Sequence, residues 1–232
     1  MKNRPDLLHE GVFYTLSDIM SFRASEPDTD RAPGAVLIPH ARFCLIRPQL
    51  EWALGQVRSF RPELVAVLQT LHRPALAQDR VFDAFCPPAR KACQGGLEMN
   101  LVSFDHPSVA KRQCYFDEEP GPELAAALCS RVFGGVPVLE LLSNPAPACP
   151  RNLSGIIGSI LKAHPRTLFV VSSNSTDPDC AVHMEKHEFT GMCARFWLDA
   201  LACRWETGQV GGDGPYWPCA VSSEAQCSAE TT

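Results

Sequence analysis

The chain has 232 residues, enough for one large domain with a sizeable core. Its formal net charge of -5 argues against a surface that binds nucleic acid or an anionic membrane. No apolar run approaches the roughly 20 residues of a membrane span, and the N-terminus has no apolar segment typical of a signal peptide. The sequence therefore predicts a cytoplasmic protein with no nucleic-acid or membrane partner.

Segments rich in β-branched and apolar residues alternate with segments that have helical spacing. Helices are expected over residues 16–22, 48–59, 124–132, 151–163 and 195–205, with Pro48 opening the second. Strands are expected over 35–38, 64–68, 80–85, 97–104, 136–142 and 168–173, and residues 86–96 are expected to be irregular. This alternation predicts an α/β fold. We expect a single-domain layered sandwich over residues 1–206, with a largely parallel central sheet flanked by helices, and a loose tail over 207–232.

Two histidines and one cysteine occupy comparable places in this pattern. Pro39 ends a buried strand directly before His40, and a second buried strand runs toward His72. Cys193 precedes a predicted helix, where the helix dipole favours a thiolate. Ligands bind at the carboxyl ends of strands in open α/β sheets. A lone histidine there is more often structural, but three such residues together favour a ligand set.

Other cysteine, histidine and serine residues give weaker support for a functional site. The chain contains 11 cysteines, an odd number, and no Cys-x-x-Cys, so a zinc ribbon and a thioredoxin-type site have no support. His183 and His187 would share a helical face, but the glutamate of a His-Glu-x-x-His protease is not in place, and a solvated segment is the better interpretation. Ser172 and Ser173 have no Gly-x-Ser-x-Gly elbow around them, which argues against acyl transfer.

Several segments, taken in order, resemble the Memo family, whose members are related to class III extradiol ring-cleaving dioxygenases. Residues 38–43 are similar to that family's Ala-Pro-His-Ala-Gly-Tyr, and residues 68–76 to its Leu-Gly-Pro-Ser-His-His-x-Pro-Leu. Residues 168–174 resemble Phe-Val-Val-Ser-Ser-Asp, and residues 190–194 resemble Thr-Ile-Cys-Gly. Residues 11–14 match the Gly-Ser-Trp-Tyr segment. The resemblance spans roughly residues 10 to 205.

The resemblance implies a metal site formed by His40, His72 and Cys193. Two imidazoles and a thiolate leave coordination positions open, as in the sites of non-heme iron oxygenases. The leading hypothesis is therefore an iron(II)-dependent oxidase or oxygenase that acts on a small molecule with dioxygen. Copper and zinc also suit this ligand set. The alternatives are a Memo-like scaffold that uses the former cleft to bind a protein partner, and a copper- or iron-handling redox protein.

The chain departs from the family pattern at several positions. Asn174 stands where the family has an aspartate, and Asp177 where it has a histidine. The family's Glu-His-Ser-x-Glu is best matched by residues 119–123, which keep both glutamates but have Pro120 in place of the histidine. Residues 97–101 are a rival match, but their distance from the next strand fits less well. No counterpart of the family's C-terminal strands follows Trp205, as expected of a divergent, C-terminally shortened member. Asp177, Asn174 and Glu123 are the candidates for orienting substrate or moving a proton; a turn residue or a helix-start carboxylate is the structural alternative.

Overall fold

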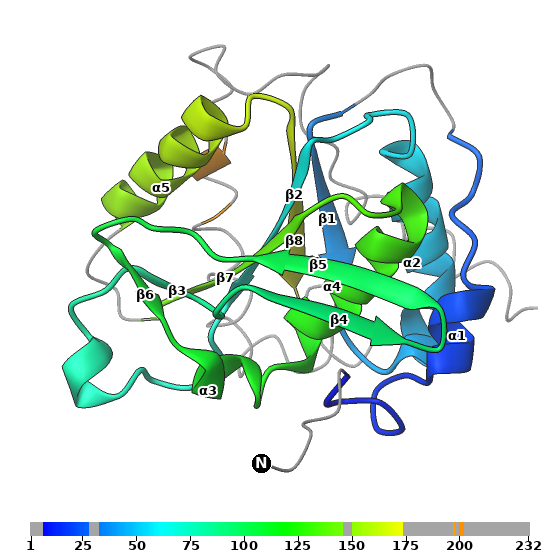
Figure 1. Cartoon of the computed structure of the whole chain (residues 1–232), viewed down its shortest axis with the longest axis horizontal. Helices are drawn as coiled ribbons and strands as arrows, with labels where there is room; N and C mark the ends of the chain where they lie inside the picture. The colour runs from blue at the N-terminus through cyan, green and yellow to red at the C-terminus, as the bar shows by residue number, and fades with distance from the viewer. Residues whose placement is uncertain (1–6, 28–32, 146–149, 174–196, 198–199, 202–232) are drawn as a thin grey trace, which may run out of the picture.

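A computed structural model describes residues 7–27, 33–145, 150–173, 197, 200 and 201 of the chain (Figure 1). Its helices are α1 (Leu16–Ser21), α2 (Phe43–Gln56), α3 (Gln113–Phe116), α4 (Pro120–Phe133) and α5 (Pro150–Ala163), with a 3₁₀ turn at Ala77–Asp79. Its strands are β1 (Ala35–Pro39), β2 (Leu64–Thr70), β3 (Ala84–Cys86), β4 (Arg90–Gln94), β5 (Leu97–Val102), β6 (Val109–Lys111), β7 (Val138–Ser143) and β8 (Thr167–Ser173).

These strands form one mixed, mostly parallel sheet. Its main path runs β1-β8-β2-β7-β3-β6, and the β4–β5 hairpin joins it through β5 beside β7. The pairs β1–β8, β8–β2 and β2–β7 are all parallel, whereas β3 runs antiparallel to β7. The α/β fold class predicted from the sequence is therefore confirmed at the level of a largely parallel sheet flanked by helices.

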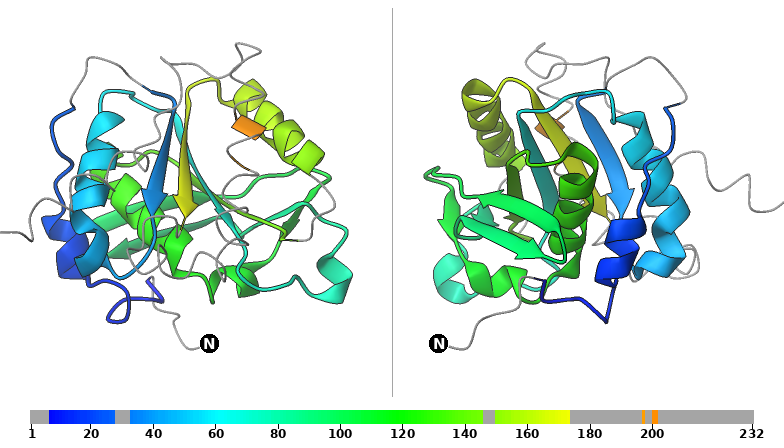
Figure 2. Two further views of the ribbon diagram at one scale, coloured as in Figure 1. Left: turned by 180° about the vertical axis from the view of Figure 1, so that it is seen from behind. Right: turned by 45° about the vertical axis from the view of Figure 1, so that its right-hand side comes forward.

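Alternating side chains of the sheet contribute to two apolar layers. Val65 and Val67 of β2 pack in the layer that contains α1, α2, α4 and the β4–β5 hairpin. Leu64, Ala66 and Leu68 of the same strand pack in the layer of α5 and Trp197. Figures 1 and 2 show α5 on the side of the sheet away from α2. Burial on both faces explains why the central strands are almost continuously apolar.

Two sequence predictions about elements were wrong. Helix α2 begins at Phe43, and Pro48 lies inside it, because Phe43 and Ile46 are buried and their packing outweighs the hydrogen bond that a proline removes. Residues 90–94, expected to be irregular, form β4 and pair with β5. The two glycines between these strands have φ values of 56° and 87°, which suits a tight hairpin turn.

The remaining differences concern short elements. The strand expected over 80–85 is confined to β3, which begins only at Ala84. Strand β6 and helix α3 were not predicted, because three or four residues carry too little periodicity to be recognised. Within the described part of the chain, no helix combines the length and the hydrophobicity needed to cross a bilayer.

Candidate functional site

Three neighbouring strands bring polar side chains to one edge of the sheet. His40 directly follows β1, Ser172 lies near the end of β8, and His72 comes two residues after β2. Because β1, β8 and β2 are adjacent and parallel, their carboxyl ends meet at the same edge. Residues separated by 132 positions in the chain are thereby placed in direct contact, since Ser172 Oγ lies 2.8 Å from His40 Nδ1.

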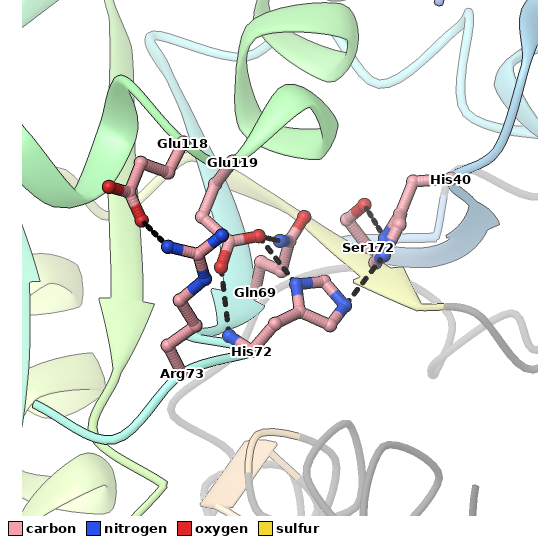
Figure 3. A network of polar contacts seen from close by, with 7 residues as sticks. All are labelled: His40, Gln69, His72, Arg73, Glu118, Glu119 and Ser172. Carbon is pink, nitrogen blue, oxygen red and sulfur yellow. Dashed lines mark hydrogen bonds and ion pairs between the residues drawn. The ribbon is translucent and has the colours of Figure 1, made fainter.

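The two histidines face each other through their Nε2 atoms. His40 Nε2 lies 3.4 Å from His72 Nε2, the ring centroids are 5.2 Å apart, and the ring planes are perpendicular (Figure 3). Each ring keeps its Nδ1 atom for a different partner. The pair therefore presents two imidazole nitrogens to one small region at the carboxyl edge of the sheet.

Glu119 holds His72 in place. Glu119 is the N-cap residue of α4, its side chain is buried, and its carboxylate points toward the loop after β2 (Figure 3). Oε1 accepts the backbone N–H of His72 at 2.8 Å, and Oε2 lies 2.5 Å from His72 Nδ1. One carboxylate thus fixes both the backbone and the ring of His72.

His40 is held by Ser172 and largely removed from water. Ser172 is itself buried, with 2% of its surface exposed. Burial lowers the pKa of His40 to about 3, and the nearby His72 acts in the same direction. The His40 imidazole therefore stays neutral at physiological pH, and a neutral imidazole is the form that can donate a lone pair to a metal ion.

Gln69 fills the space between the histidine pair and the start of α4. It is almost fully buried, and its Nε2 donates a hydrogen bond to Glu119 Oε2 at 3.0 Å. Helix α4 approaches so closely that a Cβ at Gly121 would lie 2.0 Å from Gln69 Oε1 and 3.0 Å from His40 Cγ. Glycine at position 121 is therefore required by the large amide at position 69.

Glu123, predicted as a substrate-orienting or proton-moving residue, binds the N-terminal segment. It accepts hydrogen bonds from the backbone of Leu8 at 2.9 Å and of His9 at 2.8 Å, and from Tyr14 Oη at 2.5 Å. Burial raises the pKa of Glu123, but the hydrogen bonds from His9, Tyr14 and Leu8 outweigh it and lower the pKa overall. These contacts give Glu123 a structural role in anchoring residues 8–14.

Three of the predicted site residues cannot be compared with this geometry: Cys193, Asp177 and Asn174 lie outside the described residues, as do His183 and His187 of the competing motif. Within the described ranges, no group of three or more His, Cys, Asp or Glu side chains is arranged to hold a metal ion. A third ligand of these types for the histidine pair would therefore come from another part of the chain.

Sequence reasoning assigned no role in the site to Gln69 or Ser172, and it matched Glu119 only to a glutamate of the family motif. A signal for the first two exists in strand parity. Gln69 follows Val65 and Val67 at intervals of two, and Ser172 follows Leu168 and Val170 in the same way, so both share the face that packs against α4. Polar residues that continue an apolar face at the carboxyl end of a strand are candidates for a site.

The comparisons with known proteins identify neither a family for the chain nor a function for this site. No family model matches the chain, and no curated protein sequence is significantly similar to it. The fold and site together define a mixed α/β protein with a histidine pair at the carboxyl edge of its parallel strands. Its chemistry has to be derived from those residues.

Proposed function

We propose that this chain is a divergent Memo-like protein that binds one metal ion through His40, His72 and Cys193. The supporting observation is the 3.4 Å separation of the two histidine Nε2 atoms. Two nitrogen ligands on one ion at about 2.1 Å lie about 3.4 Å apart in a tetrahedral site and about 3.0 Å apart in an octahedral one. The observed spacing supports the proposal because two ligands of a single ion would lie at about this distance from each other.

The partners of the two Nδ1 atoms also fit a metal site. Metal-binding histidines almost always engage the second ring nitrogen with a carboxylate or another polar group, which orients the ring. His72 has Glu119 in this role and His40 has Ser172. Cys193 is assigned as the third ligand by the family resemblance alone, since it lies outside the described residues.

The activity that we propose is an iron(II)-dependent oxidase or oxygenase reaction on a small molecule. A bound ferrous ion would supply the electron exchange with dioxygen that amino-acid side chains cannot perform. His40 and His72 would hold the ion, while Glu119, Gln69 and Ser172 keep both rings in one orientation. Open coordination positions would remain for the substrate and for dioxygen.

A second candidate is a Memo-like protein that binds a protein partner at this edge of the sheet. Two observations favour it: Pro120 at the start of α4 carries no group that can transfer a proton, and Glu123 is occupied by the N-terminal segment. Both positions match residues of the family's Glu-His-Ser-x-Glu motif. A site without these proton donors could keep its metal and lose its turnover.

Metal analysis of anaerobically purified protein tests the metal site. We expect about one metal ion per chain in the wild-type protein and loss of that ion in His40→Ala, His72→Ala and Cys193→Ala. The exposed residues His164 and Cys44 provide matched controls, and His164→Ala and Cys44→Ala should keep the metal. Metal retained in all three site variants would refute the proposal.

Oxygen consumption then distinguishes the two candidate functions. Protein loaded with iron(II) should consume oxygen when a small chelating substrate is added, and His40→Ala should not. If metal is bound but a broad panel of small chelating substrates produces no oxygen uptake, the binding protein becomes the better hypothesis. Tight copper(I) binding without turnover would instead favour a metal-handling protein.

A further inference from the structure

A continuous series of hydrogen bonds runs through the polar groups of the site. Ser172 Oγ lies 2.8 Å from His40 Nδ1, His40 Nε2 lies 3.4 Å from His72 Nε2, and His72 Nδ1 lies 2.5 Å from Glu119 Oε2 (Figure 3). Each imidazole uses both of its nitrogens in this series. The position of one proton therefore decides the positions of the others.

Glu119 determines which atom donates and which accepts in each of these hydrogen bonds. Two groups that can only donate already point at this carboxylate, namely the backbone N–H of His72 and the Nε2 amide of Gln69. An ionised carboxylate only accepts, so His72 Nδ1 must carry a proton and donate it. In a neutral ring, His72 Nε2 then has no proton and is an acceptor.

The same reasoning continues to His40. Two unprotonated nitrogens facing each other would repel, so His40 Nε2 carries the proton and donates it to His72 Nε2. In a neutral His40 ring, Nδ1 is then an acceptor, and the hydroxyl of Ser172 must be the donor. A serine hydroxyl can take this part because it rotates and can either donate or accept.

We propose that the metal-free protein holds His40 as the Nε2–H tautomer and His72 as the Nδ1–H tautomer. A metal ion would replace the hydrogen bond between the two rings and reverse the hydrogen bond between Ser172 and His40. The tautomers of the metal-free protein follow from the hydrogen-bond geometry. The change on metal binding rests on the proposed metal function.

Metal binding requires an unprotonated Nε2 on both rings. His72 already meets this condition because Glu119 keeps its proton on Nδ1. At His40 the N–H bond at Nε2 breaks and an N–H bond at Nδ1 forms, so the ring remains neutral and no proton is lost. His40 Nδ1 then donates to Ser172 Oγ, which changes from donor to acceptor. Ser172 is therefore a positioning residue whose hydroxyl accommodates both states.

Nuclear magnetic resonance of the ¹⁵N-labelled full-length chain at pH 8 tests the inference, because it identifies the protonated nitrogen of each ring. In metal-free protein we expect the proton of His40 on Nε2 and that of His72 on Nδ1. After addition of zinc(II), which is diamagnetic, both rings should carry the proton on Nδ1. A metal-free His40 already protonated on Nδ1 would overturn the inference and leave the metal proposal intact. Failure to bind zinc would refute the proposed change on metal binding. The metal-free spectrum would still decide whether the two tautomers are assigned correctly.

Variants at Ser172 separate positioning from simple packing. Ser172→Ala should lower zinc affinity by about 10- to 100-fold and leave metal-free His40 as a mixture of its two tautomers. Ser172→Thr should restore both the affinity and the single tautomer. Ser143→Ala is the matched control, because it also removes a buried hydroxyl from a strand. Ser143 Oγ lies 2.8 Å from Thr70 Oγ1 and does not belong to the hydrogen-bond series of the site. Wild-type zinc affinity and a wild-type His40 tautomer in Ser172→Ala would contradict the role given to Ser172.

Discussion

Glu119 and His72 are joined twice, once through the backbone and once through the ring. Glu119 Oε1 accepts the His72 backbone N–H at 2.8 Å, and Oε2 lies 2.5 Å from Nδ1. Since Glu119 occupies the N-cap position of α4, its carboxylate ties the start of that helix to the loop after β2. It also fixes which nitrogen of His72 faces His40.

Replacing Glu119 by glutamine should weaken metal binding by about 10- to 100-fold, which is typical when a group that orients a ligand is lost. A neutral amide makes the His72 ring less basic and can donate to Nδ1, which would move the ring proton to the metal-facing nitrogen. A competition titration of zinc(II) against a coloured chelator measures the change.

The adjacent glutamate supplies a matched control for this experiment. Glu118 pairs with Arg73 at 2.7 Å, and both side chains are largely exposed (Figure 3). Exposed pairs of this kind contribute little, so Glu118→Gln should leave zinc affinity unchanged. Equal losses in the two variants would mean that general negative charge, and not orientation of His72, governs the site.

Gln69 and Gly121 should be energetically coupled. Gly121→Ala places a Cβ 2.0 Å from Gln69 Oε1, so the amide must move and release Glu119, at a cost of about 1–3 kcal/mol. Combining Gly121→Ala with Gln69→Ala should cost less than the sum of the single changes, by about 1 kcal/mol or more. Urea unfolding of the four proteins measures the coupling.

A glycine in another helix provides the reference for this double-mutant cycle. Among the described residues, no atom outside the adjacent backbone of α5 lies within 4 Å of a Cβ added at Gly155. Gly155→Ala should therefore stabilise the protein by up to about 1 kcal/mol through its helix propensity. Additive effects of Gln69→Ala and Gly121→Ala would show that a Cβ at position 121 does not meet the Gln69 side chain in solution.

The central strands could be predicted from sequence because they are buried on both faces. Residues 64–68 and 168–173 are runs of apolar or β-branched residues, and these runs became β2 and β8 with boundaries close to those expected. Strand β5 was expected, but β4 was missed because it is rich in polar residues and because the two glycines that follow it suggest irregular structure. Turn chemistry, and not hydrophobicity, carries the signal there.

The approach of the two histidines to each other could be expected from sequence, and their environment could not. His40 and His72 each follow a buried strand, and parallel neighbours align their carboxyl ends. That Glu119 would reach His72 depends on where α4 packs, which no local pattern specifies. Glu123 shows the converse, since its place four residues further along the same helix directs it to the N-terminal segment.

Glu123 should behave as a structural residue in mutagenesis. Tyr14→Phe removes the hydroxyl that donates to Glu123 at 2.5 Å, and hydrogen bonds to charged groups contribute about 1.5–3 kcal/mol. We expect a loss of this size in urea unfolding, together with faster proteolysis of the N-terminal segment. A Glu123→Gln variant that keeps wild-type stability but loses oxygen uptake would instead support a role in the reaction.

Glu140 should make the stability of the protein fall as the pH rises. This carboxyl group lies on β7, with 4% of its surface exposed, and burial raises its pKa from 4.5 to about 7, with Glu123 adding to the rise and Arg90 opposing it. The folded state therefore binds a proton that the unfolded state has lost between pH 4.5 and 7. Stability is greatest at the acidic end of this window and declines until Glu140 is ionised in both states.

Glu140→Gln removes this dependence because an amide does not ionise. The variant should exceed the wild-type free energy of unfolding by about 1 kcal/mol at pH 5 and by about 3 kcal/mol at pH 8, provided that the amide packs as the protonated acid does. Urea unfolding at both pH values measures the difference, and Glu98→Gln, at an exposed position on β5, is the control that should change little at either pH. A gap between wild type and Glu140→Gln that stays constant from pH 5 to pH 8 would show that Glu140 titrates alike in the folded and unfolded states.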